Sequence, residues 1–207
     1  DQDAMPSHDL RSLMNFAAET VYAAGRMTLG YFAAGIRPDF KADDSPVTIA
    51  DRLSEEMIRR RIEEQYPDHA IVGEEVAEKV SAGATYRWFV DPIDGTKSFI
   101  RGVPLYAVLL GLEVDRKVEV GAAYYPGTDE MLCGATGEGA WWNGRRARVS
   151  EVADLTRAFV SFTDVGSFAR YGRQAAWDRL ASRAYYRAGW TDAYGYMLVA
   201  TGRVEIM

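Results

Sequence analysis

A chain of 207 residues, 48% of them hydrophobic and 26% charged, is long enough to bury a sizeable core and has the composition of an ordinary globular protein. Its formal net charge of −6, with acidic and basic residues interspersed, argues against binding to nucleic acid or to an anionic membrane. The single cysteine, Cys133, excludes an intrachain disulfide. The sequence also shows no apolar run of transmembrane length and no signal peptide. Together with the single cysteine, these features indicate a cytoplasmic protein. Only two histidines are present, so carboxylates must carry any metal or acid–base chemistry.

The first predicted elements are two helices. Apolar residues at spacings of three and four predict a helix over residues 8–34 and a second over residues 49–65. Thr48 is the expected N-cap of the second helix, and Asp51, three residues on, completes a capping box. Residues 1–4 are expected to be the remnant of an expression tag and to lie outside the fold.

After the second helix the periodicity changes to that of strands. Strands are predicted at residues 70–72, 87–90, 105–114, 117–125, 131–135 and 158–162, with turns at 115–116, 137–139 and 143–144. The rest is predicted as a helix over 169–183, an extended segment over 184–188, a helix over 191–201 closed by Gly202, and the start of a strand at 204–207. This order predicts a mixed α/β fold, in which layers of helices pack against sheets.

The stretch WFVDPIDGTKSF, residues 88–99, places two carboxylates where a buried strand is expected to end. Pro92 biases Asp91 to an extended conformation and can begin a sharp turn that returns Asp94 toward Asp91. Two carboxylates held close repel, and a shared proton or a cation relieves the repulsion. With hard oxygen ligands and neither histidine nor cysteine nearby, Mg²⁺ or Mn²⁺ is the expected cation, and the Ile93 carbonyl is a natural further ligand.

Neighbouring residues extend this predicted site. Gly95 lets the backbone approach a ligand closely, and a helix starting at Thr96 would present free N–H groups to a phosphate. Glu74 also follows a predicted strand, so neighbouring strand ends are expected to place it beside Asp91. The Thr96 hydroxyl is expected to orient an attacking water, with Asp51 behind it. Together these residues indicate metal-assisted phosphoryl transfer to water.

Each feature also has a purely structural interpretation. Taken alone, residues 91–94 read as a turn, Glu74 as part of a solvated loop and Asp51 as a helix-start residue. Lys41 is expected to be solvated, and Cys133 to be a small core residue. The catalytic interpretation is favoured because a strand precedes residues 91–94 and Gly-Thr follows them directly.

The Gly-Glu-Glu segment at 73–75 and the DPIDGT motif at 91–96 resemble the signature of the inositol monophosphatase-like, Mg²⁺-dependent, lithium-sensitive phosphatases, with matching spacing. The segment 45–51 is similar to the family's upstream segment, whose aspartate supports the threonine that orients water. The resemblance runs from about residue 8 to the end of the chain. It implies a layered αβαβα sandwich and a homodimer.

The resemblance implies that the acidic residues hold metal ions. Glu74, Asp91 and the Ile93 carbonyl would surround one metal, and Asp91 with Asp94 would hold a second. Glu74 would also face a third, weaker metal site through water. Mg²⁺ is the implied cofactor, with Mn²⁺ as a possible substitute.

The resemblance also assigns the phosphate and the water. The backbone amides of Gly95 and Thr96 would hold the phosphate, and Thr96 with Asp51 would orient the nucleophilic water. The family's later Trp-Asp-x-Ala motif, whose aspartate completes the second metal site, would follow residue 207, where this chain stops. We expect the chain to be incomplete, because its last strand is cut off midway. If that aspartate were truly absent, the second metal would bind weakly.

The subfamily is indicated by two further segments. Residues 97–104, KSFIRGVP, and residues 189–196, with Thr191 where a glycine is common, are more similar to the histidinol-phosphatase branch than to inositol monophosphatases. Asp192, near a helix start, would suit a cationic amine or imidazole as in L-histidinol phosphate; its alternative role is to favour the helix dipole. Trp190 and Tyr194 are expected to be core residues rather than an imidazole platform.

The expected function is therefore Mg²⁺-dependent hydrolysis of L-histidinol phosphate, a small phosphorylated metabolite, in histidine biosynthesis. The expected domain covers residues 5–207 in two lobes, 5–150 and the start of a second at 151–207. One alternative substrate is inositol 1-phosphate or a related sugar phosphate; a 3′-nucleotide is a weaker candidate. An alternative of another class is a non-catalytic metal- or phosphate-binding dimer.

Overall fold

The computed structural model describes residues 9–35, 37–42, 46–79 and 83–207, so the expected tag remnant at 1–4 lies outside the described residues. The first helix, α1 (Leu10–Thr28), begins where the Asp9 carboxylate accepts the N–H groups of Arg11 and Ser12. It ends six residues before the predicted position 34. The reason is tertiary: Phe32 packs against Phe99 and Tyr106, with ring centroids 5.7 and 5.3 Å away, so the chain turns off the helix axis after Thr28.

The second helix, α2 (Ile49–Gln65), has the predicted boundaries because the predicted capping box is present at its start. The Asp51 carboxylate accepts both the backbone N–H of Thr48, at 2.7 Å, and its hydroxyl, at 2.6 Å. The short strands before it, β1 (Asp39–Phe40) and β2 (Pro46–Val47), form an antiparallel pair.

The main sheet has seven strands among the described residues, in the sequence order from β3 to β9. Their bounds are β3 Ala70–Gly73, β4 Tyr86–Asp94, β5 Ala107–Val114, β6 Lys117–Tyr125, β7 Glu130–Ala135, β8 Gly139–Trp142 and β9 Arg145–Arg146. The β3–β4 pair is parallel and the other pairs are antiparallel. Two predicted turns are confirmed: Asp115 and Arg116 join β5 to β6, and Asn143 with Gly144 joins β8 to β9, all at positive φ as hairpin turns require.

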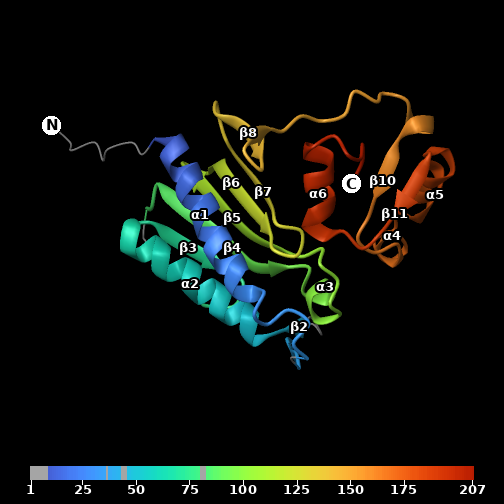
Figure 1. The fold of residues 1–207 in the computed structure, drawn as a ribbon. Coiled ribbons are helices and arrows are strands. Elements are labelled where there is room, and N and C mark those ends of the chain that lie inside the picture. The colour runs from blue at the N-terminus through green and yellow to red at the C-terminus, as the bar shows by residue number, and fades with distance from the viewer. Residues whose placement is uncertain (1–8, 36, 43–45, 80–82) are drawn as a thin grey trace.

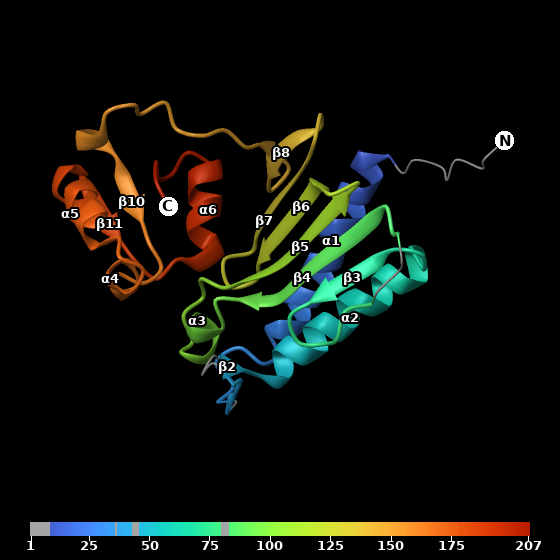
Figure 2. The ribbon, with the colours of Figure 1, turned by 180° about the vertical axis from the view of Figure 1, so that it is seen from behind.

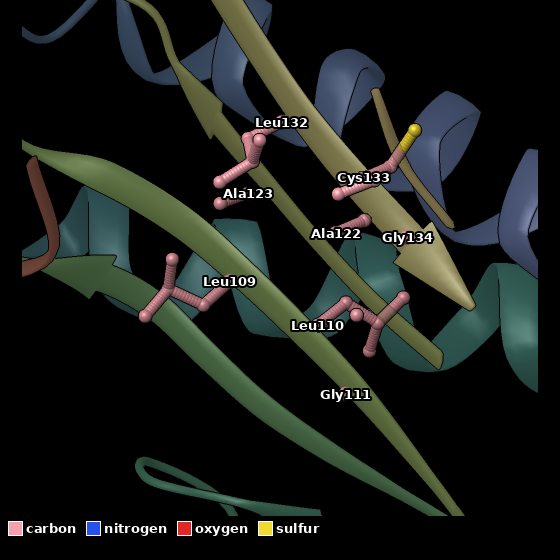
Figure 3. Close-up of a pocket in the computed structure, with 10 residues that line it drawn as sticks. Leu109, Leu110, Gly111, Ala122, Ala123, Leu132, Cys133 and Gly134 are labelled. Carbon is pink, nitrogen blue, oxygen red and sulfur yellow. The ribbon is translucent and has the colours of Figure 1, made fainter. Parts of the chain in front are cut away.

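The two faces of this sheet are covered differently. Helices α1 and α2 pack against each other and over one face, where Val21, Ile58, Trp88 and Leu110 lie in the largest core cluster (Figures 1 and 2). On the face turned away from these helices, Leu109 and its small neighbours on β6 and β7 line a shallow pocket (Figure 3). One end of that face packs against the last helix, as described next.

The C-terminal part adds a second small sheet and three helices. After a 3₁₀ turn at Leu155–Arg157, β10 (Phe159–Ser161) pairs in parallel with β11 (Tyr186–Ala188). Between them lie α4 (Gly166–Arg170) and α5 (Gln174–Arg183), and α6 (Asp192–Ala200) follows. The single helix predicted over 169–183 is wrong, because Gly172 between the two helices has a φ of 65°. Of the strand start predicted at 204–207, one parallel bridge forms, from Val160 to Ile206.

Helix α6 lies between the two sheets, and α4 and α5 lie outside the smaller one (Figures 1 and 2). Met197 of α6 is buried with Tyr125 and Ala107 of the main sheet, while Trp177 of α5 packs with Val160 of β10. The layers therefore run helix, sheet, helix, sheet, helix, which confirms the predicted αβαβα fold class.

Candidate active site

The predicted neighbours Glu74 and Asp91 are brought together by the parallel pairing of β3 and β4. In that register Gly73 pairs with Val90, so Glu74, which directly follows β3, comes next to Asp91 of β4. The sequence prediction for this pair of carboxylates is therefore confirmed in its placement.

The expected sharp turn at Pro92 is wrong, because β4 continues as far as Asp94. Asp91 pairs with Leu109 of β5 and Asp94 pairs with Ala107, so the register shifts between them. One extra residue on β4 is a β-bulge, which re-aims side chains without ending the strand. The Ser54 hydroxyl of α2 donates to the Pro92 carbonyl at 3.0 Å and fixes the bulge from below.

The electrostatics of the two aspartates indicate a site for positive charge. Burial, followed by the negative charges of Asp94, Glu74 and Asp51, raises the pKa of Asp91 to about 8. Burial also raises the pKa of Asp94 to about 6, although the Ala193 N–H, 2.8 Å away, opposes this rise. Among the described residues, the buried Oδ1 of Asp91 has no hydrogen-bond partner. A buried carboxylate oxygen without a donor, facing other carboxylates, is what a bound cation would satisfy.

The chemistry of these residues fits a hard divalent cation, but their side chains are not arranged around a common point in this structure. Within the described part of the chain, no three acidic, histidine or cysteine side chains surround a common point. The Glu74 carboxylate turns instead to Lys41, whose Nζ lies 2.8 Å from Glu74 and 2.6 Å from Glu75. Burial alone would lower the pKa of the Lys41 ammonium, but the hydrogen bonds to both glutamates raise it above its usual value. Lys41 was expected to be solvated; its ion pairs with Glu74 and Glu75 show that this expectation is wrong, and no local sequence pattern marks the contact.

The predicted helix start after the aspartates is confirmed. Helix α3 (Thr96–Ile100) has Gly95 as its N-cap with φ 80°, a left-handed conformation that favours glycine. The Thr96 hydroxyl donates to the Ile93 carbonyl at 3.0 Å. The Asp51 carboxylate, expected to lie behind Thr96, accepts hydrogen bonds from the backbone N–H and the hydroxyl of Thr48. Asp51 still lies close enough for its charge to raise the pKa of Asp91, after burial and the nearer carboxylates.

Asp192 reaches the same place from the far end of the chain. It is the first residue of α6, and its Oδ2 lies 3.5 Å from the Ser98 hydroxyl and 3.1 Å from where a side chain on Gly95 would begin. Burial raises the pKa of its carboxyl, against the lowering effect of hydrogen bonds from Thr163 and Ser98. Trp190 is 51% exposed with φ 71°, so its expected place in the core is wrong.

The layered fold is similar to that of solved inositol monophosphatase structures, which places the chain in a class of α/β phosphatases. The chain belongs to the inositol monophosphatase family, whose sequence pattern matches residues 9–207. This confirms the resemblance described above, and the chain is accordingly a phosphatase. No helix among the described residues is long and apolar enough to cross a membrane.

Individual proteins support this assignment. The chain is 41% identical to the histidinol-phosphatase of Chlorobaculum parvum over 93% of its own length and 74% of that protein's. It is 35% identical to the histidinol-phosphatase of Mycobacterium tuberculosis, over 97% of its own length and 78% of that protein's. Among solved structures, it is similar to the inositol monophosphatase of Anabaena, with 28% identity, a TM-score of 0.82, and coverage of 95% of this chain and 74% of the other.

Proposed function

We propose that this chain hydrolyses the phosphomonoester L-histidinol phosphate in a reaction that depends on Mg²⁺. The observation that carries this proposal is the position of Asp192, whose half-buried carboxylate lies against Gly95 at the start of α3. A negative charge beside the expected phosphate site would repel the phosphate unless the substrate also carries a cation there. The amine of histidinol phosphate supplies such a cation, and neutral inositol does not.

The residues present have the chemistry to hold the cofactor. Glu74, Asp91, Asp94 and the Ile93 carbonyl would hold Mg²⁺, or Mn²⁺ in its place. When bound, the metal supplies positive charge that polarises the phosphate and makes water a better nucleophile. The unpartnered Oδ1 of Asp91 supports this assignment more directly than the ion-paired Glu74 does.

The remaining residues bind and orient the reactants. The first N–H groups of α3 have no partner within the helix, so those of Gly95 and Thr96 are assigned to the phosphate oxygens. The Thr96 hydroxyl orients the attacking water, which requires it to leave the Ile93 carbonyl, and Asp51 supports it from behind. Asp192 receives the substrate's ammonium group and so fixes which phosphate esters are accepted.

The names of the relatives favour this substrate. Both curated relatives described above are histidinol-phosphatases and align over most of this chain. The similar Anabaena structure keeps inositol 1-phosphate, or a related sugar phosphate, as the second candidate substrate. A non-catalytic metal-binding dimer is the alternative of another class, and it predicts metal binding without turnover. We further propose inhibition by lithium, a homodimer, and a cytoplasmic role in histidine biosynthesis.

The deciding experiment measures phosphate release from L-histidinol phosphate and from inositol 1-phosphate, first with Mg²⁺ and then with EDTA. We expect EDTA-sensitive turnover that favours histidinol phosphate. An Asp192→Asn variant should lower kcat/KM for histidinol phosphate by about 10-fold, the value of one lost charged hydrogen bond, and leave inositol 1-phosphate unaffected. A preference for inositol 1-phosphate would contradict the proposed substrate, and turnover in EDTA would contradict the proposed cofactor.

A further inference from the structure

Glu55 is a charged residue that the proposed reaction does not use, and its side chain is fully buried. It lies on α2 and its carboxylate faces the loop that follows β3. One oxygen accepts the backbone N–H groups of Glu74, at 3.0 Å, and Glu75, at 2.7 Å. The other accepts the N–H of Val76 at 3.1 Å. Three consecutive N–H groups of the loop that carries Glu74 thus end on one side chain.

Arg59, one turn further along α2, completes this contact. Its Nε donates to the Glu55 carboxylate at 2.8 Å, and its Nη2 donates to the Val76 carbonyl at 3.0 Å. The pair therefore binds the loop through both its N–H and its C=O groups. Arg59 is also buried, so the charge of Glu55 is neutralised by an ion pair inside the protein. This ion pair and the hydrogen bonds to the loop offset the desolvation penalty of burying both groups.

Gly73 must be a glycine for lack of space beside Glu55 and Arg59, independently of any ligand. A Cβ on Gly73 would overlap the Glu55 carboxylate and would lie 2.7 Å from Nη2 of Arg59. Its φ lies outside the left-handed region, so space is the constraint rather than backbone conformation. The glycine admits the Glu55 and Arg59 side chains against the backbone just before Glu74.

We propose that Glu55, together with Arg59, is a positioning residue that fixes the backbone of Glu74 and so sets the affinity of the site for divalent metal. Glu55 does not itself bind the metal, because each of its oxygens already accepts two donors. This inference rests on the proposed metal-binding role of Glu74. Residues that orient metal ligands by hydrogen bonds typically change metal affinity by about 10–100-fold when they are replaced.

The test replaces Glu55 by glutamine, which keeps the shape of the side chain. Whichever oxygen becomes an NH₂ group then opposes two donors, so part of the loop loses its anchor. Two quantities are measured without substrate: Mn²⁺ affinity by calorimetric titration, and hydrogen exchange of the amides of residues 74–76 by NMR. We expect Mn²⁺ affinity to fall by about 10-fold or more and these amides to exchange faster. Glu56→Gln, the same change on the exposed side of α2, should alter neither.

A second variant covers the case in which Glu55→Gln does not fold. Gly73→Ala displaces the Glu55 carboxylate without removing a buried charge, and should produce the same two effects. In the double variant the two losses should not add, because both changes break one contact. Wild-type Mn²⁺ affinity in either folded variant would overturn the proposal, as would unchanged amide exchange. If the wild-type chain binds Mn²⁺ but hydrolyses neither ester, the proposed substrate fails while the positioning role stands.

Discussion

Asp91 and Asp94 are three residues apart, yet their surroundings give their carboxyls different proton affinities. Burial first, and then neighbouring carboxylates, raise the pKa of Asp91 from 3.8 to about 8, whereas that of Asp94 rises to about 6. An acid with a higher pKa in the folded chain than in the unfolded chain binds its proton more tightly when folded. Its contribution to the free energy of unfolding is complete below the unfolded pKa and is lost as the pH rises through the folded one.

The metal-free protein should therefore become less stable as the pH rises, with the loss due to Asp91 running from its unfolded pKa of 3.8 up to about 8. Asp91→Asn, which has no charge to lose, should remove the decline between about pH 6 and pH 8, where Asp94 has already titrated. The measurement is the melting temperature against pH in EDTA, for the wild type and the variant. Mg²⁺ should stabilise the wild type more at the high end of the range, since it displaces protons. Parallel curves for the two proteins would contradict this account.

Gly95 is tested by a comparison with another glycine. Gly95 and Gly102 both have left-handed backbones, with φ 80° and 70°, so alanine should cost about 1–2 kcal/mol of stability at either position. Only at Gly95 would the new Cβ approach the Asp192 carboxylate, at 3.1 Å; at Gly102 it meets Ala33 at 3.8 Å. We expect similar losses of stability in urea unfolding, and a much larger loss of phosphate release for Gly95→Ala. Equal activity losses in the two variants would show that backbone strain alone explains the effect.

At the scale of the elements, the sequence predicts a helix where its signals are local and fails where tertiary contacts decide. The bounds of α2 follow from the Thr48 capping box, and β6 also has its predicted ends. The apolar periodicity of α2 marks only part of its buried face: Ile58 and Ile62 are buried as it predicts, but Ile49 is 45% exposed, while the charged residues Glu55 and Arg59 are buried. Hydrophobic periodicity cannot reveal the burial of Glu55, because Glu55 is buried by its hydrogen bonds to the loop at residues 74–76, about twenty residues away in sequence.

The same distinction applies to the candidate site. The neighbourhood of Glu74 and Asp91 is predictable, because each follows an apolar run that forms a strand and the two strands pair in parallel, although β4 continues past Asp91. The approach of Asp192 to Ser98 is expected only through the family resemblance. The two residues are 94 positions apart, so no local sequence pattern relates them. The Lys41 ion pairs and the β4 bulge were not predicted, because they depend on how loops pack around the sheet edge.

The Thr48 capping box is predicted to stabilise α2 and to hold Asp51 in place. Thr48→Ala removes the hydroxyl that donates to Asp51 at 2.6 Å and accepts from Ala50 at 3.1 Å, and should cost about 1 kcal/mol in urea unfolding. Thr48→Ser keeps the hydroxyl and should lose much less. If Asp51 supports catalysis only when so held, phosphate release should fall in the alanine variant and not in the serine variant. Equal stability of the two variants would mean that the capping box contributes little.

At the scale of the whole molecule, the candidate site depends on how α6 is held against the main sheet. Glu130 of β7 is almost fully buried and binds both parts of the chain. It accepts the Tyr194 hydroxyl at 3.0 Å and pairs with Arg203 at 2.9 Å, while Trp142 of β8 donates to it at 3.2 Å. Beside this cluster, the Tyr125 hydroxyl donates to the Ala193 carbonyl at 3.0 Å. Asp192 thus reaches the carboxylates of β4 through contacts made on the sheet.

Glu130→Ala should therefore weaken the attachment of α6 and cost about 1–2 kcal/mol, because it leaves two half-buried donors, on Trp142 and Tyr194, without their acceptor. Since Asp192 moves with α6 and Glu74 does not, the KM for histidinol phosphate should rise. Mn²⁺ affinity should change much less, because among the proposed metal ligands Asp94 contacts α6, through the Ala193 N–H. Glu113→Ala, on the same sheet with a longer 3.9 Å pairing to Arg87, is the matched control and should change neither quantity. An equal loss of metal affinity and substrate affinity in Glu130→Ala would contradict this prediction. It would show that metal binding at the sheet and substrate binding at α6 cannot be separated.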